Sequence, residues 1–375
     1  MPACYGITLM LGYEAGALQL ALLSATNELG LGGTGMGLPV TAQFISMSVM
    51  PLLVGPVADR AGKKKVIFAF LVVFVAGCLL TWLCASAAQL LIGVFIIGAG
   101  FSVCECMTTA AISDAYVESG EKYINLAQSF FCVGAVGSPI LLQALMDGLS
   151  ASWRAGFVIS AIAMAALLPV LLFSRFTAFA RVEGADAQPR QKSPFLIIGF
   201  VVCIFIYAGV ESGIAYFADT VFTLGLDKPV LGAFAISLFW GFMGIGRVLF
   251  GRMKKIPPRA TAVSLFFAAA VVLAMMFCGQ ETIMLGLYAA SGLALACVWP
   301  GIAHASVAID RGASGKIMSY LNLGSGLGAS LIPLAIGAII NTTGISIAFL
   351  VLALISVASA FYMFANTKNG LRSPG

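Results

Sequence analysis

The chain has 375 residues, of which 61% are hydrophobic and only 9% are charged. Ordinary soluble proteins have roughly 45–50% apolar and about 25% charged residues. This composition therefore excludes a soluble enzyme, a disordered chain, a nucleic-acid-binding protein and a disulfide-stapled secreted protein. It predicts an all-α membrane protein whose partner is the lipid bilayer. The net charge of +5 reflects topology rather than an acidic partner.

Apolar stretches of the roughly 20 residues that a helix needs to cross a bilayer recur along the whole chain. The first six predicted spans are Cys4 to Asn27, Leu38 to Val57, Val66 to Ala87, Leu90 to Ser113, Tyr123 to Met146 and Trp153 to Phe176. After a polar stretch, six more follow: Phe195 to Phe222, Val230 to Phe250, Thr261 to Cys278, Thr282 to Val307, Ile317 to Asn341 and Ile345 to Ala365. Twelve transmembrane helices are therefore expected.

The lysines and arginines predict how these spans are oriented. Eighteen of the 20 fall in or beside the turns that follow spans 2, 4, 8 and 10, the polar stretch that follows span 6, and the C-terminal tail. Only Arg154 and Lys228 lie on the opposite side. Because basic residues are enriched in cytoplasmic loops, both termini are expected in the cytoplasm and the protein in the inner membrane. The expected aromatic belt at the opposite boundary contains Trp82 and Trp153.

The central polar stretch separates two halves that resemble each other. Residues 1–177 are expected to form an N-terminal six-helix bundle, 178–193 a cytoplasmic linker, 194–366 a C-terminal six-helix bundle and 367–375 a cytoplasmic tail. Gly12-Tyr13-Glu14-Ala15-Gly16 in span 1 recurs as Gly209-Val210-Glu211-Ser212-Gly213 in span 7. The basic turn that begins at Gly55 recurs, at nearly the same spacing, at Gly251. Two such matches favour pseudo-symmetric halves with a central cleft.

The segment Gly55-Pro56-Val57-Ala58-Asp59-Arg60-Ala61-Gly62-Lys63-Lys64 resembles the signature turn between spans 2 and 3 of the major facilitator superfamily. Within it, the fucose-permease branch of sugar–proton symporters is the most similar. That resemblance rests on Glu105 in span 4, Asn125-Leu126-Ala127-Gln128-Ser129-Phe130 in span 5 and Tyr207-Ala208-Gly209-Val210-Glu211 in span 7.

The signature turn suggests a gate. Gly55 allows span 2 to approach a neighbouring helix, and Gly62 permits a tight turn. The resemblance implies that Asp59, beside Arg60, faces the positive N-terminus of span 11 when the cytoplasmic side is closed. The second copy begins at Gly246-Arg247, so Arg247 is also expected to take part in gating. The alternative is a loop that only sets topology.

Three carboxylates lie where lipid is expected. Glu14, Glu105 and Glu211 fall within spans 1, 4 and 7, and the single histidine, His304, falls in span 10. Each carboxylate costs about 2.5–3.5 kcal/mol at a span centre on insertion scales. The resemblance implies that spans 1, 4, 7 and 10 line the central cleft. We therefore expect the three acids to converge there, with no basic residue beside them at that depth.

Proton coupling requires acids that gain and lose a proton. The resemblance implies that Glu105 carries the proton and that Glu14 binds substrate. Glu14 is also a candidate for proton coupling, and Glu211 fits either role. Further substrate-binding candidates supply hydrogen bonds or an aromatic face to a sugar-like solute. They are Gln128, Tyr207, Trp299 and Asn322.

Together these features predict a monomeric, proton-coupled symporter of a small sugar-like solute that works by alternating access. No cofactor, metal or catalytic group is expected, and the sequence contains no P-loop pattern for ATP. One alternative is a proton-coupled exporter of drugs or metabolites on the same fold. A membrane sensor that binds a solute without moving it, or a channel, fits the paired halves less well.

Overall fold

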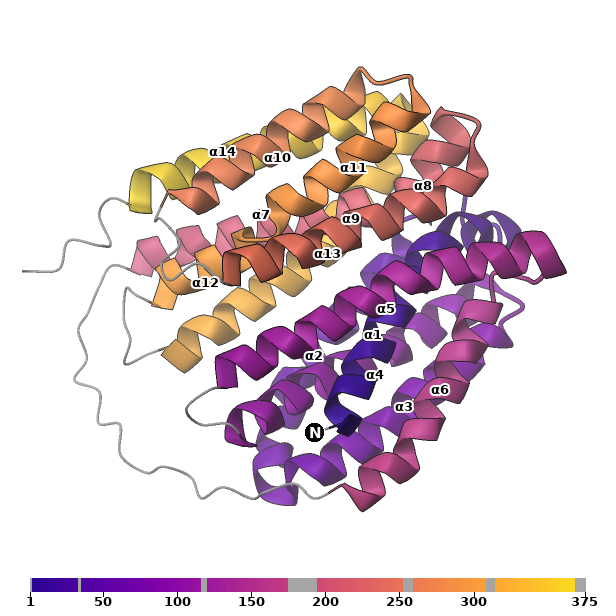
Figure 1. Cartoon of the computed structure of the whole chain (residues 1–375), viewed down its shortest axis with the longest axis vertical. Coiled ribbons are helices and arrows are strands. Elements are labelled where there is room, and N and C mark those ends of the chain that lie inside the picture. The colour runs from indigo at the N-terminus through magenta and orange to yellow at the C-terminus, as the bar shows by residue number, and fades with distance from the viewer. Residues whose placement is uncertain are drawn as a thin grey trace, which may run out of the picture.

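The computed structural model describes residues 2–32, 35–115, 120–174, 194–251, 259–307 and 314–367. Every regular element in these residues is a helix (Figure 1). The first half comprises α1 (Pro2–Glu28), α2 (Leu38–Ala61), α3 (Lys63–Trp82), α4 (Ala87–Ala115), α5 (Gly120–Leu149) and α6 (Ala155–Phe173). The second half comprises α7 (Pro194–Tyr216), α8 (Ala218–Thr220), a π-helical turn (Val221–Gly225), α9 (Pro229–Gly251), α10 (Ala260–Met276), α11 (Glu281–Leu295), α12 (Val298–Val307), α13 (Ser314–Thr343) and α14 (Ile345–Thr367).

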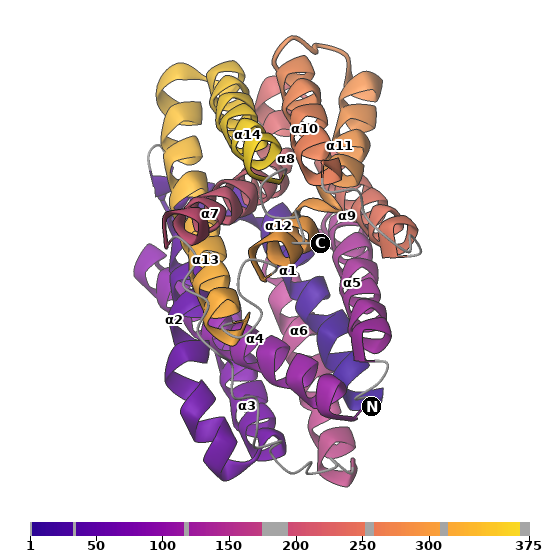
Figure 2. The same ribbon diagram turned by 90° about the vertical axis from the view of Figure 1, so that its left-hand side faces the viewer.

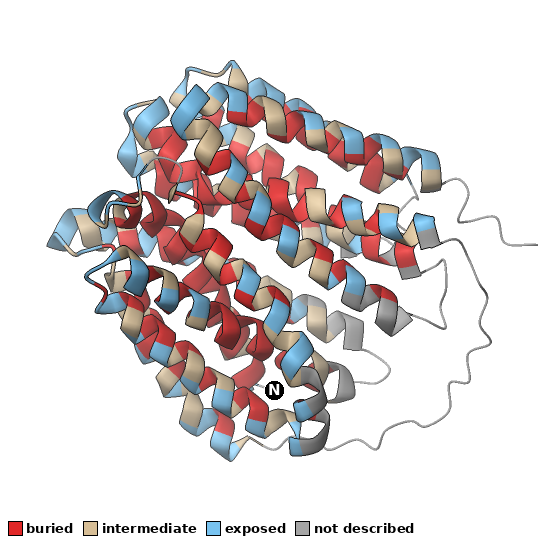
Figure 3. Cartoon of the chain, turned by 180° about the vertical axis from the view of Figure 1, so that it is seen from behind, coloured by how far each residue is buried: buried red, intermediate tan, exposed pale blue. Residues whose placement is uncertain are grey.

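The helices have the length and surface of membrane spans. Among the described residues, ten stretches are long and apolar enough to cross a bilayer, and Leu38–Val54 and Ala260–Met276 are shorter apolar helices. Exposed residues cover the outward faces, and buried residues fill each half and the region where the halves meet (Figure 3). Large apolar side chains such as Phe173 and Phe195 are 88% and 81% exposed. Such a surface is stable in lipid rather than in water.

The two halves use the same pattern of helix pairs. In the first half α1 packs on α5, α2 on α4 and α3 on α6; in the second half α7 packs on α13, α9 on α11 and α10 on α14. The repeated Gly-x-Glu-x-Gly motif lies at matching positions in this pattern. A Cβ at Gly12 would overlap the Phe131 carbonyl oxygen on α5, and one at Gly209 would overlap the Ile332 side chain on α13. The two copies of the motif therefore share a close helix–helix contact at the first glycine as well as the glutamate.

The side-chain contacts at the helix ends show which turns lie together. Lys63 Nζ donates to the Ala110 carbonyl at 3.4 Å, and Lys64 Nζ donates to the Leu172 and Ser174 carbonyls at 2.7 and 2.8 Å. These contacts join the start of α3 to the C-terminal part of α4 and the C-terminal end of α6, where cations are favourable. The sequence predicts that 18 lysines and arginines lie on this side of the molecule. We call this side the basic end and the other side the opposite end.

The predicted signature turn is mostly helical. Helix α2 continues through Asp59 and Arg60 to Ala61, and the turn consists of Gly62 alone, at φ 90°. The prediction of a longer turn was wrong because no residue before Gly62 stops the helix. The surroundings of Gly55 and the side chains of Asp59, Arg60 and His304 are outside the described part of the structure.

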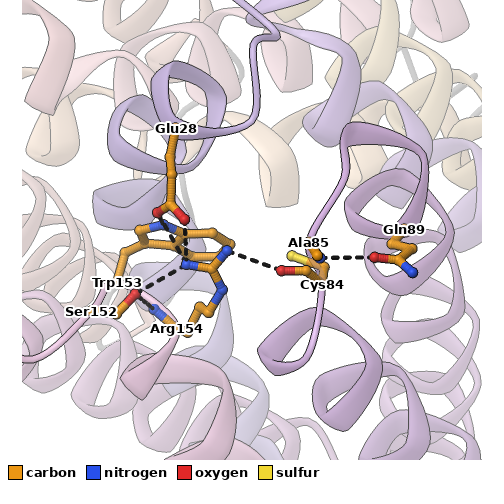
Figure 4. Close-up of polar contacts among 7 residues, drawn as sticks. All are labelled: Glu28, Cys84, Ala85, Gln89, Ser152, Trp153 and Arg154. Atoms are coloured by element: carbon orange, nitrogen blue, oxygen red, sulfur yellow. Dashed lines mark hydrogen bonds and ion pairs between the residues drawn. The ribbon is translucent and has the colours of Figure 1, made fainter.

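A polar clamp joins three turns at the opposite end (Figure 4). The Glu28 carboxylate accepts a hydrogen bond from Trp153 Nε1 at 2.7 Å and from Arg154 Nη1 at 2.8 Å. Arg154 Nη2 also donates to the Cys84 carbonyl at 2.9 Å. The assignment of Trp153 to an aromatic belt was wrong, because its side chain is 3% exposed and its indole N–H is used inside the protein.

Two predicted spans contain a break. Helix α7 ends at Tyr216, and the chain continues through α8 and the π-helical turn. The predicted span 10 is divided into α11 and α12 around Cys297, whose Sγ lies 3.0 Å from Ser264 Oγ. Interrupted helices are characteristic of binding regions in transporters, because they leave backbone groups for ligands and allow local bending.

Candidate functional site

The halves meet along two helix pairs, α2 with α13 and α5 with α9 (Figure 2). Thr41 Oγ1 donates to the Ser330 carbonyl at 2.9 Å across the first pair. Ser237 Oγ donates to the Val136 carbonyl at 2.7 Å across the second pair. Between these two contact lines, helices α1, α2, α4, α5, α7 and α9 bring several polar and charged side chains together.

The first polar group is an acid–arginine cluster drawn from both halves. Arg247 on α9 lies with Nη2 3.9 Å from Oε1 of Glu211 on α7. Arg247 also donates toward the Tyr207 hydroxyl, which in turn donates to Glu211. In the first half, Glu105 on α4 is within electrostatic range of Arg247 and accepts from Gln128. The cluster comprises Glu105, Gln128, Cys132, Tyr207, Glu211 and Arg247.

The presence of Arg247 corrects the expectation that no basic residue accompanies these acids. Arg247 is near the C-terminal end of α9, which ends at Gly251, yet its Nη2 lies 3.9 Å from Glu211 Oε1. The guanidinium therefore reaches the depth of Glu211 on α7. The Arg247 and Glu211 side chains are 26% and 19% exposed. Two carboxylates and one guanidinium give this partly accessible cluster a surplus of acid, so protonation or a ligand can change its balance.

Glu14 lies apart from this cluster. Its carboxylate is 0% exposed and accepts from Gln43 Nε2 on α2, at 3.2 Å to Oε1 and 3.1 Å to Oε2. The Gln43 Oε1 atom accepts from the Tyr216 hydroxyl at 3.4 Å. The structure therefore brings two of the three predicted acids, Glu105 and Glu211, into one cluster. The third, Glu14, is buried against Gln43. In this state Glu14 is not open to a substrate.

A second amide contact crosses between the halves nearby. Trp240 Nε1 on α9 donates to Gln19 Oε1 on α1 at 2.8 Å. The Trp240 ring meets Phe131 edge-on, with ring centroids 5.5 Å apart, and Phe131 meets Phe101 at 6.2 Å. We call Glu14, Gln19, Gln43, Tyr216 and Trp240 the amide network. Aromatic faces beside amides are the groups that bind polar solutes containing hydroxyls.

The other predicted residues have different environments. Gln128 and Tyr207 belong to the acid–arginine cluster. Trp299 is half-buried against the core of the second half, and Asn322 is exposed on α13. The described contacts place neither of them in the cluster or in the amide network.

Sequence reasoning missed Gln19, Gln43, Tyr216 and Trp240. One signal was present, because Gln19 and Gln43 are amides within long apolar stretches, where an unpaired polar group is costly. The acids attracted attention first because their charge makes that cost larger. The pairing of Gln43 with Glu14 depends on the packing of α1 against α2, which no local pattern shows.

Within the described part of the chain, no group of three or more histidine, cysteine or acidic side chains is arranged to hold a metal ion. The nine cysteines are free thiols, and seven of them are buried. The chemistry available at the interface is therefore that of carboxylates, a guanidinium, amides, a phenol and aromatic rings.

Known proteins with similar sequences include carriers of different solutes. The chain is 30% identical over 152 residues to the chloramphenicol resistance protein CraA of Acinetobacter baumannii, a match that covers 40% of this chain and 36% of that protein. It is 25% identical over 362 residues to a glucose/galactose transporter of Brucella abortus biovar 1, covering 87% and 84% of the two chains.

Among solved structures, a bacterial homologue of the human lysosomal transporter Spinster, in an inward-facing and occupied conformation, superposes with a TM-score of 0.80. The match covers 100% of this chain and 98% of that one at 15% identity, so it concerns the fold alone. The family model of the Major Facilitator Superfamily matches residues 4–282. With the helix pairing described above, these matches show that the chain belongs to the Major Facilitator Superfamily and is a membrane transporter.

Proposed function

We propose that this protein is a secondary carrier that moves a small polar solute, sugar or sugar-like, together with protons. The two six-helix halves alternately expose the interface to each side of the membrane. The basic end faces the cytoplasm of the inner membrane. The observation that carries the proposal is the acid–arginine cluster, in which Arg247 pairs with Glu211 of its own half and lies within electrostatic range of Glu105 of the other half.

The cluster suggests how a proton is linked to movement of the halves. Ionised Glu105 is attracted to Arg247 across the interface, and this attraction is strong in a medium of low dielectric constant. A proton on Glu105 removes the attraction, while Glu211 stays beside Arg247 within the second half. The halves can then separate on one side, and release of the proton restores the attraction. Proton uptake at Glu105 thus changes the relative stability of the two conformations.

The test begins with purified protein and a set of stated probes. D-glucose, D-galactose, L-fucose and chloramphenicol are screened by thermal shift, because a ligand that binds the folded state raises its melting temperature. The sugar that stabilises the protein is then radiolabelled and its uptake measured in proteoliposomes with and without an inward proton gradient. We expect the gradient to accelerate uptake.

Two variants make the proton test specific. Glu105→Gln should abolish the response to the gradient while retaining exchange of labelled for unlabelled sugar. Glu281→Gln is the matched control, because Glu281 is at the opposite end and pairs with Lys228 at 3.2 Å. It should respond as the wild type does. Uptake in the wild type that is indifferent to the gradient would contradict proton coupling, while the assignment as a carrier would remain.

A second candidate, export of a drug, is favoured by the 30% identity to the chloramphenicol resistance protein over 152 residues. The same preparation separates the two. If chloramphenicol, and none of the sugars, stabilises the protein, inverted membrane vesicles should accumulate it when acidified inside. Absence of accumulation there, with sugar uptake in proteoliposomes, excludes the exporter.

A further inference from the structure

The inference concerns Gln43, which occupies an unusual place on α2. One face of α2 and the turn before it contacts the second half through residues spaced by three or four. A Cβ at Gly37 would lie 2.6 Å from Leu334 Cα; Thr41 bonds Ser330, Phe44 packs edge-on against Tyr216, and Ser48 lies against Gly326. Gln43 borders this face and is 1% exposed. Its side chain joins the face to the acid inside the first half.

The two ends of the Gln43 amide are not interchangeable here. The –NH₂ group faces Glu14, because Nε2 donates to both oxygens of the carboxyl group, at 3.2 and 3.1 Å. The amide oxygen then faces the opposite direction, where it accepts from Tyr216 at 3.4 Å. Reversing the amide would place its oxygen against the carboxylate oxygens. Glu14 therefore sets the orientation in which Gln43 can receive the Tyr216 hydroxyl.

Tyr216 lies at the point where the second half meets α2 near the opposite end. It is the last residue of α7, and its ring meets Phe44 edge-on with centroids 5.9 Å apart. The segment that follows continues the same contact, because Thr220 Oγ1 donates to Met36 Sδ at 3.9 Å. Holding Tyr216 thus supports the whole row of contacts that closes the opposite end.

The backbone of Gln43 is also held firmly. A Cβ at Gly98 on α4 would overlap the Gln43 carbonyl oxygen, so α2 and α4 are in close backbone contact at this level. The position of the Gln43 side chain is therefore determined by the first half, and Tyr216 is the partner that moves with the second half.

We propose that Gln43 is a positioning residue of the transport cycle, which Glu14 orients so that its amide oxygen holds Tyr216 and keeps the opposite end of the molecule closed. This inference rests on the proposed function, because it assumes that the halves move relative to each other. It assigns to Glu14 a role in gating through Gln43, distinct from the proton chemistry at Glu105.

The experiment measures the separation of the two halves directly. Nitroxide labels are placed at Leu149, the last residue of α5, and at Phe277, directly after α10, in a chain whose native cysteines are replaced. Both positions are at the opposite end of the molecule and are 76% and 77% exposed. Distances are recorded by electron–electron resonance in lipid nanodiscs without substrate or proton gradient. Gln43→Leu should increase the population at longer distances. Because a net hydrogen bond contributes about 1 kcal/mol, the closed-to-open ratio should fall roughly fivefold.

Three further variants separate positioning from packing. Tyr216→Phe, which retains the ring and loses the hydroxyl, should open the end as Gln43→Leu does, and it keeps the test valid if Gln43→Leu does not fold. The double variant Glu14→Gln with Gln43→Glu exchanges the two groups and should restore the closed population. Gln89→Leu is the matched control, because Gln89 is exposed and accepts only from the nearby Ala85 N–H at 2.8 Å.

Two results would overturn the inference. The first is an unchanged distance distribution in both Gln43→Leu and Tyr216→Phe. The second is failure of the exchanged pair to restore closure, which would mean that Gln43 acts only by filling space. Neither readout uses transport, so a failure of proton coupling in the Glu105 experiment is a separate result.

Discussion

At the scale of single residues, Arg247 changes the meaning of the acids around it. Two carboxylates alone in an apolar interface would repel each other and bind protons firmly. A shared guanidinium allows one of them to be ionised and makes the other sensitive to its surroundings. Arginine suits this position because its planar group can serve several partners at once: here it donates toward Tyr207 and Cys132 and forms an ion pair with Glu211.

The first prediction tests this arrangement. Arg247→Gln leaves Glu105 and Glu211 without a counter-charge, and it should lower the free energy of unfolding by about 2 kcal/mol, less than the roughly 3–5 kcal/mol lost when a fully buried pair is broken. The double variant Arg247→Gln with Glu211→Gln should recover most of that loss, because the unpaired charge is gone, yet should not recover transport. Thermal unfolding in detergent and sugar exchange measure the two effects. Equal melting temperatures for the single and double variants would contradict the pairing.

A second prediction concerns Asp219, which lies on α8 beyond Tyr216, the last residue of its candidate span. It is 7% exposed, and Thr223 Oγ1 donates to its Oδ1 at 3.4 Å. Burial raises the pKa of Asp219 from 3.8 to about 7. A raised acid pKa means that the folded protein binds the proton more tightly than the unfolded chain does. Asp219 therefore favours folding most below about pH 4, and this advantage falls as the pH rises to about 7.

The measurement is the melting temperature of the purified protein from about pH 5 to pH 8. The wild type should lose more stability over this range than Asp219→Asn, whose amide has no charge to bury. The difference between the two proteins removes the effect of all other titrating groups. Parallel curves would show that Asp219 does not titrate in this range.

The sequence predicts residue types better than it predicts their partners. The cost of charge in lipid was enough to single out Glu14, Glu105 and Glu211, since it depends only on position within a span. Their partners depend on which helices meet and on how far a side chain reaches. Arg247 was therefore expected near the basic end, and Gln43 was not noticed, although each contacts one of the predicted acids.

At the scale of elements, hydropathy predicted where the helices lie but not where they are interrupted. The breaks after Tyr216 and around Cys297 occur in stretches that are as apolar as the helices themselves. The break after Tyr216 has no glycine or proline beside it, so no local stop signal marks it. The break around Cys297 has one, because Pro300 cannot donate to the Ala296 carbonyl and its ring clashes with that group. The contact between Ser264 and Cys297 lies at this break. The opposite case is Gly62, whose role in a tight turn was expected from its residue type.

A third prediction compares two glycines of helix α5. A Cβ at Gly134 would overlap the Leu9 carbonyl oxygen and lie 2.6 Å from Tyr13 N on α1, whereas nothing lies within 4 Å of one at Gly137. Gly134→Ala should force α1 and α5 apart and cost about 1–3 kcal/mol, as overpacking does. Gly137→Ala makes the same chemical change in the same helix without a neighbour to displace. Its melting temperature should be unchanged or slightly higher. Similar losses in both variants would show that helix flexibility, rather than close packing, is what the glycines supply.

At the scale of the whole molecule, the repeat and the interface have opposite roles. The same helix pairs build each half, so each half can move as a unit. The contacts between the halves lie mainly on two helix pairs, α2 with α13 and α5 with α9. They include small side chains such as Thr41, Ser237 and Ser330. Small groups allow two helices to slide or rock without leaving large side chains unpacked. This arrangement is what alternating access requires.

The last prediction concerns how the molecule sits in the membrane. The sequence assigns 18 of the 20 lysines and arginines to the basic end, and the two others, Arg154 and Lys228, are paired with Glu28 and Glu281 at the opposite end. Because cytoplasmic loops are enriched in basic residues, a green fluorescent protein fused after Gly375 should fluoresce, and alkaline phosphatase fused there should be inactive. Phosphatase inserted after Leu149, which is exposed at the end of α5, should be active. The reverse pattern would mean that the acid–arginine cluster is approached from the other side, and that the end closed by Gln43 and Tyr216 faces the cytoplasm.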